Sequence, residues 1–295
     1  MMRGMRIVVT GATGLLGGWL VSELANAGDE VIAFGGPSRG KNGLDVTDGP
    51  AVTAAIVAAR PDAVIHAAAL SAMSDCARAP DLARRINVEG TANVVAACRE
   101  AGARLVHVST DLVFDGEHAP YDTSSPTAPT SVYGRTKADA EREVAQVEGV
   151  VVRVSLLFGP TRTARRGFFD QQLDMLRRGE RLRLFHDEWR TPLSLRAAAE
   201  ALSAIARSDV KGVLHVGGPE RLSRWEMGLA LAGVLGLPRH VAESSIERAS
   251  RTSIGGEPRP RDVSLDSTAF RRAFPGIAVE PFAKECARMG VSSEA

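Results

Sequence analysis

Short apolar runs alternate with longer segments of helical periodicity through the first half of the chain. Runs rich in β-branched residues predict buried strands, and the segments between them predict helices. Such alternation is typical of βαβ units, so it predicts an α/β fold with a right-handed, doubly wound parallel sheet. The predicted strands are 7–10, 30–34, 62–66 and 104–108, and the predicted helices are 19–27, 50–60 and 80–101.

The rhythm becomes less regular after residue 150. A further strand is expected over 150–158, and it is followed by shorter pieces of both kinds. These are strands over 181–185 and 212–216 and helices over 168–178, 196–207 and about 225–235.

A glycine-rich segment connects the first predicted strand to the first predicted helix. It reads Gly11-Ala12-Thr13-Gly14-Leu15-Leu16-Gly17. Glycines let a backbone approach a pyrophosphate, and a helix N-terminus supplies free N–H groups. The segment therefore predicts a dinucleotide site, with a tight turn packed by glycines as the alternative.

The end of the second predicted strand bears on the choice of cofactor. An acidic residue there accepts hydrogen bonds from the adenosine ribose of NAD. This chain has no acid there and carries Ser38, Arg39 and Lys41 instead. A 2′-phosphate is thus tolerated or bound, which favours NADP over NAD, although the two cations are equally consistent with solvated loop charges.

Tyr133 and Lys137 are one helical turn apart, so their side chains share a helix face. An ammonium close to a phenol favours the phenolate, so we expect Lys137 to lower the pKa of Tyr133 toward neutral pH. Thr110 follows the fourth predicted strand, where ligands bind in such sheets. We expect the three side chains to face one pocket beside the nicotinamide.

Composition excludes several classes of protein. A net charge of +1 lacks the basic excess of nucleic-acid binders. No apolar span is long enough for a membrane helix or a signal peptide, so a cytoplasmic location is expected. Cys76, Cys98 and Cys286 are too far apart in sequence to indicate a metal site or a disulfide framework. His66, alone in an apolar strand, is expected to be a core residue.

Several motifs together resemble a known family. They are Thr10-Gly11-Ala12-Thr13-Gly14-Leu15-Leu16-Gly17, Ala67-Ala68-Ala69, Ser109-Thr110-Asp111-Leu112-Val113-Phe114-Asp115-Gly116, Val132-Tyr133-Gly134-Arg135-Thr136-Lys137, Arg190-Thr191-Pro192 and Arg259-Pro260-Arg261-Asp262-Val263-Ser264-Leu265-Asp266. The chain resembles the extended short-chain dehydrogenase/reductases, and within them the dTDP-4-dehydrorhamnose reductase-like branch.

The resemblance implies a Rossmann-type domain over 1–160 and a smaller C-terminal α/β substrate lobe over 161–295, with segments about 190–222 returning to the sheet. It implies a catalytic triad of Thr110, Tyr133 and Lys137, and a nucleotide-sugar substrate; a homodimer is compatible with it. The implied cofactor contacts are Gly11, Thr13, Gly14, Leu15, Leu16, Gly17, Ser38, Arg39, Asp45, Val46, Ala67, Ala68, Ala69, Tyr133, Lys137 and Ser155. The implied substrate contacts are Ser71, Asp111, Phe168, Arg259 and Arg261, the two arginines for a diphosphate.

The implied activity is reduction of a 4-keto group on a nucleotide-activated deoxysugar. An epimerase or dehydratase of the same superfamily is one alternative, and a non-catalytic NADP-binding subunit similar to the methionine adenosyltransferase beta subunit is another. The chain departs from the branch at 73–77, 167–169 and Asp187-Glu188. These departures concern the substrate side rather than the hydride chemistry.

Overall fold

A six-stranded parallel sheet forms the centre of the computed structural model, which describes residues 4–147, 149–253 and 255–292, without the side chains of Arg39 and Lys41. Every neighbouring pair of strands in this sheet is parallel. From edge to edge the strands are β10 (Gly212–Val216), β5 (Gly149–Val154), β4 (Arg104–Thr110), β3 (Ala63–His66), β1 (Arg6–Thr10) and β2 (Glu30–Phe34). The predicted α/β fold with a doubly wound parallel sheet is confirmed.

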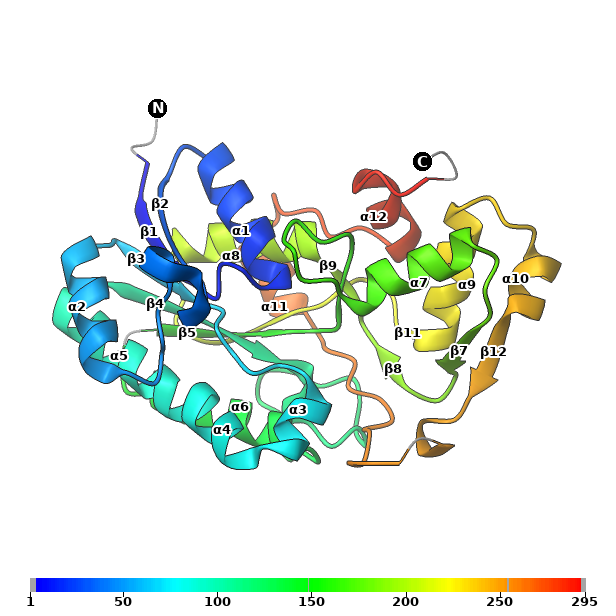
Figure 1. The fold of residues 1–295 in the computed structure, drawn as a ribbon, viewed down its shortest axis with the longest axis horizontal. Helices are drawn as coiled ribbons and strands as arrows, with labels where there is room; N and C mark the ends of the chain where they lie inside the picture. Colours follow the sequence, from blue (N-terminus) through cyan, green and yellow to red (C-terminus); the bar gives the residue numbers. More distant parts are fainter. Residues whose placement is uncertain (1–3, 148, 254, 293–295) are drawn as a thin grey trace.

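Helices cover both faces of the sheet (Figure 1). One face packs against α1 (Leu15–Asn26), α8 (Leu195–Ala206) and α11 (Thr268–Ala273). The other packs against α2 (Gly49–Ala59), α5 (Gly90–Ala101) and α6 (Val132–Val144). Strand residues alternate between these two apolar clusters, as a sheet buried on both sides requires.

The strand order reverses between β1 and β3, because β2 lies on one side of β1 and β3 on the other. The carboxyl ends of strands flanking such a reversal leave a crevice in which ligands bind. Here the crevice lies between the glycine turn after β1 and Ala67-Ala68-Ala69 after β3.

The predicted helix over 80–101 is interrupted. It consists of α4 (Pro80–Arg84), a π-helical turn η2 (Arg85–Glu89) and α5. Asn87 lies in the π turn, and its buried amide bonds both the N–H and the C=O of Leu70. π turns of this kind are frequent at functional sites.

The predicted strand over 150–158 is wrong as a single element. It divides into β5 and β6 (Leu157–Phe158), and β6 pairs instead with β9 (Leu193–Ser194). Ser155 stands at the break, where its N–H still bonds Val216 of β10 but its hydroxyl turns to Asp111 after β4. The break therefore places a polar side chain at the carboxyl edge of the sheet.

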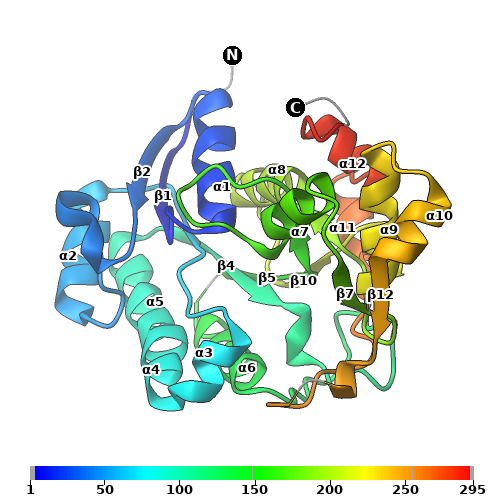
Figure 2. The ribbon, with the colours of Figure 1, turned by 45° about the vertical axis from the view of Figure 1, so that its right-hand side comes forward.

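The second half of the chain builds a smaller α/β lobe with its own apolar core (Figures 1 and 2). Short strand pairs accompany its helices, β7 with β12 in parallel and β8 with β11 antiparallel. Its elements are α7 (Phe168–Arg177), β7 (Leu182–Phe185), β8 (Trp189–Arg190), β11 (Leu222–Ser223), α9 (Arg224–Val234), α10 (Arg239–Ser245), β12 (Ile246–Ala249) and α12 (Phe282–Arg288). The segments β10 and α8 belong to the central sheet and its cover.

Short helical turns complete the described elements: η1 (Pro37–Asn42), α3 (Met73–Arg78), η3 (Asp111–Val113) and η4 (Arg251–Ser253). Within the described ranges, no helix combines the length and apolar character needed to cross a membrane. The three cysteines are buried free thiols.

Candidate active site

A cavity of about 970 Å³ opens at the carboxyl edge of the sheet, between the sheet and the lobe. Most of the residues that sequence analysis assigns to the site line it. These are Gly11, Thr13, Gly14, Leu15, Leu16, Gly17, Ser38, Asp45, Val46, Ala67, Ala68, Ala69, Ser71, Thr110, Asp111, Tyr133, Ser155 and Phe168. The topology thus brings together segments that are far apart in sequence.

The glycine turn packs too closely for side chains. Gly11 has φ +72°, and a Cβ on it would lie 2.7 Å from the carbonyl carbon of Ala67. A Cβ on Gly17 would lie 2.2 Å from the carbonyl oxygen of Gly11. The turn therefore brings bare backbone and the N-terminus of α1 to the cavity wall, a combination that suits an anionic diphosphate.

The outer end of the cavity is lined by η1 and the segment after it. Asp45 accepts hydrogen bonds from the N–H and the hydroxyl of Thr47, at 2.9 and 2.8 Å, and these bonds lower the pKa of its carboxyl. Ser38 faces the same end, and the side chain of Arg39 lies outside the described part of the structure. Directly after β2 the cavity wall has Gly35 and Gly36, where an NAD site carries a carboxylate.

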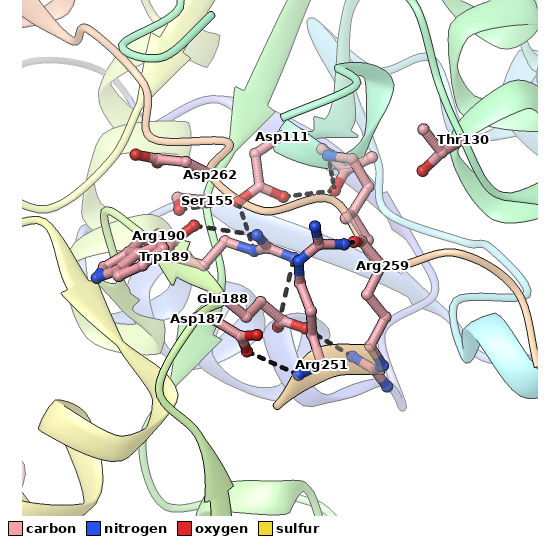
Figure 3. Close-up of polar contacts among 12 residues, drawn as sticks. Asp111, Thr130, Ser155, Asp187, Glu188, Trp189, Arg190, Arg251, Arg259 and Asp262 are labelled. Atoms are coloured by element: carbon pink, nitrogen blue, oxygen red, sulfur yellow. Dashed lines mark hydrogen bonds and ion pairs between the residues drawn. The ribbon is translucent and has the colours of Figure 1, made fainter. Parts of the chain in front are cut away.

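Asp111 lines the cavity and connects the ends of β4 and β5 through its hydrogen bonds, and Figure 3 shows its carboxylate beside Ser155 and Arg190. Its carboxylate accepts the hydroxyl of Thr110 at 3.2 Å and that of Ser155 at 3.0 Å, and Nε of Arg190 lies 3.5 Å away. Burial raises the pKa of Asp111, and the charge of Arg190 and the two hydroxyls oppose that rise. The contacts hold Thr110 at the cavity wall in a fixed orientation.

Tyr133 lies in the first turn of α6, which is capped by Ser131: the Ser131 hydroxyl accepts the N–H of Gly134 at 3.1 Å. Burial and the charge of Asp111 raise the pKa of Tyr133, and a hydrogen bond with Thr110 only partly offsets them. The expectation that Lys137 lowers the pKa of Tyr133 is wrong for this structure, because the lysine ammonium bonds His107 on β4. The phenol is therefore the protonated form at neutral pH.

Lys137 is buried with 2% of its surface exposed and does not line the cavity. Its Nζ lies 2.9 Å from Nε2 of His107 on β4. Burial lowers the pKa of Lys137 to about 8, and the carboxylate of Glu141, one turn farther along α6, opposes this effect. Tyr133 and Lys137 therefore share a helix face, but only Tyr133 lines the cavity.

The two arginines predicted for a diphosphate also lie off the cavity wall. Nη1 of Arg259 lies 3.0 Å from Glu188, so its guanidinium is already paired (Figure 3). Arg261 is exposed. Among the described side chains, the cations that line the cavity are Arg85, Arg165 and Arg190, which sequence analysis did not assign to the site.

Arg190 is the buried member of these three cations, and two carboxylates hold its guanidinium. It is 4% exposed and lies between Asp111 and Glu188, 3.4 Å from the latter (Figure 3). The sequence contained a signal for Arg190, because this residue begins the Arg-Thr-Pro signature and only Trp189 separates it from Asp187-Glu188. Within the described residues, no group of three His, Cys, Asp or Glu side chains is arranged to hold a metal ion.

Comparison with known proteins agrees with this geometry. Residues 5–291 match the family model of the RmlD substrate binding domain. A dTDP-4-keto-6-deoxy-D-glucose reductase of Streptomyces niveus is 31% identical over 91% of each chain. The methionine adenosyltransferase 2 subunit beta of Xenopus laevis is 30% identical over 90% of this chain and 82% of its own.

Among solved structures, dTDP-4-dehydrorhamnose reductase from Bacillus anthracis in complex with NADP superposes with a TM-score of 0.87. It is 24% identical and the match covers 98% of this chain and 99% of that one. The glycine turn after β1, the Ser-Thr-Asp end of β4 and the Tyr-Lys helix are all contained in the matched region. The chain therefore belongs to the RmlD substrate-binding domain family.

Proposed function

We propose that this protein is an NAD(P)H-dependent reductase of the 4-keto group of a nucleotide-activated deoxysugar. The observation that carries the proposal is a single cavity that holds both the glycine turn and the hydroxyls of Thr110 and Tyr133. The relative from Streptomyces niveus, by its name a dTDP-4-keto-6-deoxy-D-glucose reductase, supports the substrate class.

The residues of the cavity fit a dinucleotide cofactor. The backbone at Gly11, Gly14 and Gly17 would hold the diphosphate, Asp45 and Val46 the adenine end, and Ala67 to Ala69 a flat group beside β3. When bound, the reduced nicotinamide supplies a hydride to the carbonyl carbon. Gly35 and Gly36, which stand in place of an acid directly after β2, support NADP, with NAD as the alternative.

Tyr133 is the proton donor in this proposal. Negative charge develops on the carbonyl oxygen during reduction, and the phenol gives its proton to that oxygen. The raised pKa keeps the phenol protonated beforehand, as a general acid requires. Thr110 orients the same oxygen, and its own orientation is fixed by Asp111. Lys137, the third member of the implied triad, lies off the cavity wall and bonds His107.

The cellular location, the division into domains and the assembly are also part of the proposal. We place the enzyme in the cytoplasm, with residues 1–160 as the cofactor domain and 161–295 mostly as the substrate lobe. A homodimer is the proposed assembly. Size-exclusion chromatography with light scattering tests the last point directly.

The activity is tested with a panel of nucleotide 4-keto-6-deoxysugars, each offered with NADPH and with NADH. Loss of the reduced nicotinamide together with a 4-hydroxy product supports the proposal. A redox-neutral product with bound NAD would instead indicate an epimerase or dehydratase, the reading for which Asp111 after Thr110 is the candidate acid.

A second candidate function is an NADP-binding subunit without turnover. The observation that favours it is the 30% identity to the methionine adenosyltransferase 2 subunit beta, which extends over 90% of this chain. Its test is NADPH binding by calorimetry alongside the same panel. Tight binding with no reduction of any sugar would support this candidate against the reductase.

A further inference from the structure

A row of buried polar side chains crosses the face of the sheet that α5 and α6 cover. Its members alternate along their strands with residues of the apolar core on the opposite face. They are Thr10 on β1, His66 on β3, His107 and Ser109 on β4, Arg153 on β5 and His215 on β10. The members on β4 and β5 lie beneath α6, the helix that carries Tyr133 and Lys137.

His107 is the member of the row that bonds Lys137, at 2.9 Å from Nζ to Nε2. An ammonium has no acceptor, so Nε2 accepts and the ring proton lies on Nδ1. Among the described residues, Nδ1 has no hydrogen-bond partner. A buried donor without a partner disfavours folding. Packing alone therefore does not account for a histidine at this position, where an apolar side chain would leave no unpaired donor. The hydrogen bond to Lys137 is the interaction that an apolar side chain could not make.

His66 shows what a purely structural histidine in the same place looks like. It is the register partner of His107 on the neighbouring strand, and both are fully buried. Its Nδ1 lies 2.7 Å from the hydroxyl of Thr10 and its Nε2 lies 3.1 Å from that of Thr91. Both of its nitrogens are paired, and neither bonds Lys137.

The charged and titratable groups around the Lys137 ammonium come from three elements. His107 faces it from β4, His66 stands behind on β3, and Glu141 lies one turn along α6. Burial and the charge of Lys137 hold the pKa of His107 well below its ordinary value, so the ring stays neutral. Glu141 is itself bonded to Ser109 and Arg153. The neutral imidazole is thus the direct partner of the ammonium.

We propose that His107 is a positioning residue for the reductase site, which holds the ammonium of Lys137 by accepting one of its three N–H bonds. The bond fixes the lysine side chain one turn along α6 from Tyr133, and so holds this part of the helix on β4. The expected effect on kcat rests on the proposed function, whereas the hydrogen bond between His107 and Lys137 can be tested without turnover.

The test uses three substitutions of His107 and one control. His107→Leu and His107→Phe remove the acceptor, and His107→Gln retains one. His66→Leu is the control, because it removes an equally buried imidazole from the same face whose nitrogens bond Thr10 and Thr91 and not Lys137. The chain has only four lysines, Lys41, Lys137, Lys211 and Lys284, so Lys137 can be assigned in lysine-labelled protein.

NMR of the labelled lysine gives the pH at which Lys137 titrates. In the unsubstituted protein we expect a midpoint near 8. Loss of the acceptor removes stabilisation of the charged form, so His107→Leu and His107→Phe should lower the midpoint by about one pH unit or more. His107→Gln and His66→Leu should leave it unchanged. Unchanged midpoints in both the Leu and the Phe variants would overturn the proposal.

Two further measurements separate the inference from the proposed function. Nitrogen-15 NMR of the histidines in the unsubstituted protein should show a proton on Nδ1 of His107, and a proton on Nε2 would overturn the proposal without any variant. If a 4-keto sugar is reduced, kcat should fall by roughly tenfold to hundredfold in His107→Leu, recover in His107→Gln and change little in His66→Leu. Failure to reduce any sugar would contradict the function alone.

Discussion

The hydroxyl of Ser155 donates to Oδ2 of Asp111 at 3.0 Å, and this bond joins the ends of two neighbouring strands of the sheet. It forms because the chain leaves β5 at Ser155 before it pairs again as β6. The other carboxylate oxygen of Asp111 accepts from Thr110. The position of the proposed catalytic threonine is therefore set by a strand that follows it in sequence.

Arg190 compensates two buried carboxylates at once, so its loss should be costly. Arg190→Met leaves Asp111 and Glu188 without their shared cation in a region of low dielectric. Removing one partner of a buried pair typically costs about 3–5 kcal/mol. We expect the free energy of unfolding, measured by urea denaturation, to fall by about that amount.

The control for Arg190 is an exposed ion pair. Arg239→Met removes the pair between Arg239 and Glu243 on α10, which is open to solvent. Such pairs contribute about 0.5 kcal/mol or less. Equal effects of the two substitutions would show that the buried network does not stabilise the fold.

Two Gly→Ala substitutions in helices, one in the glycine turn and one outside it, should have opposite effects on stability. At Gly17 in α1 the new Cβ would lie 2.2 Å from a backbone oxygen, so the turn must shift, at a cost of about 3 kcal/mol or more. Gly233 in α9 has no neighbour within 4 Å, and Gly233→Ala should instead stabilise the helix by up to about 1 kcal/mol.

Thermal unfolding of both variants, followed by NADPH titration, measures this difference. Gly17→Ala should lower Tm and weaken cofactor binding, whereas Gly233→Ala should raise Tm slightly and leave binding unchanged. A Gly17→Ala protein with the Tm and the NADPH affinity of the parent would refute the close packing of the turn.

The buried histidines predict acid sensitivity that begins well above the titration of carboxylates. Burial lowers the pKa of His66 to about 3 and that of His215 to about 4, from an ordinary value of 6.5. The unfolded chain therefore binds protons that the folded chain does not, and stability is lost as pH falls below 6.5 toward these folded values. Each such histidine contributes about 1.4 kcal/mol per pH unit in that window.

Urea denaturation at a series of pH values between neutrality and about pH 4 measures this slope. His215→Gln should reduce the slope by about 1.4 kcal/mol per unit. His240→Gln is the control, since that side chain is exposed, and should leave the slope as it is. A stability independent of pH over this range would mean that the buried rings are not held neutral.

Much of the fold follows from the sequence because its signals are local. The β-branched runs, the glycines after the first strand and the helical periodicities each depend on neighbours within a few residues, and the strands around His66 and His107 were placed correctly on that basis. The carboxyl ends of parallel strands meet at one edge, which is why Thr110, Asp111 and Ala67 could be assigned to one cavity.

The features that sequence analysis missed depend on contacts across the sheet. Spacing puts Tyr133 and Lys137 on one helix face, but only the strand below shows that the lysine bonds His107. The break at Ser155 depends on a partner strand farther along the chain, and the π turn at Asn87 depends on a bond to Leu70. The resemblance and the bidentate guanidinium likewise made Arg259 a candidate for a diphosphate, although Glu188 already binds it.

The role of Tyr133 is the central claim, and its loss should affect chemistry without affecting binding. Tyr133→Phe removes only the phenolic oxygen, so the cavity keeps its shape and the affinity for NADPH should stay the same. Loss of a general acid typically reduces the rate by about 10²- to 10⁴-fold.

The most direct test is the rate at which NADPH is consumed with a nucleotide 4-keto-6-deoxysugar, compared between the parent protein and Tyr133→Phe at saturating concentrations of both ligands. The account predicts turnover by the parent, a loss of at least about 10²-fold in the variant, and equal NADPH affinity in a separate titration. A variant that reduces the sugar at nearly the parental rate would contradict it.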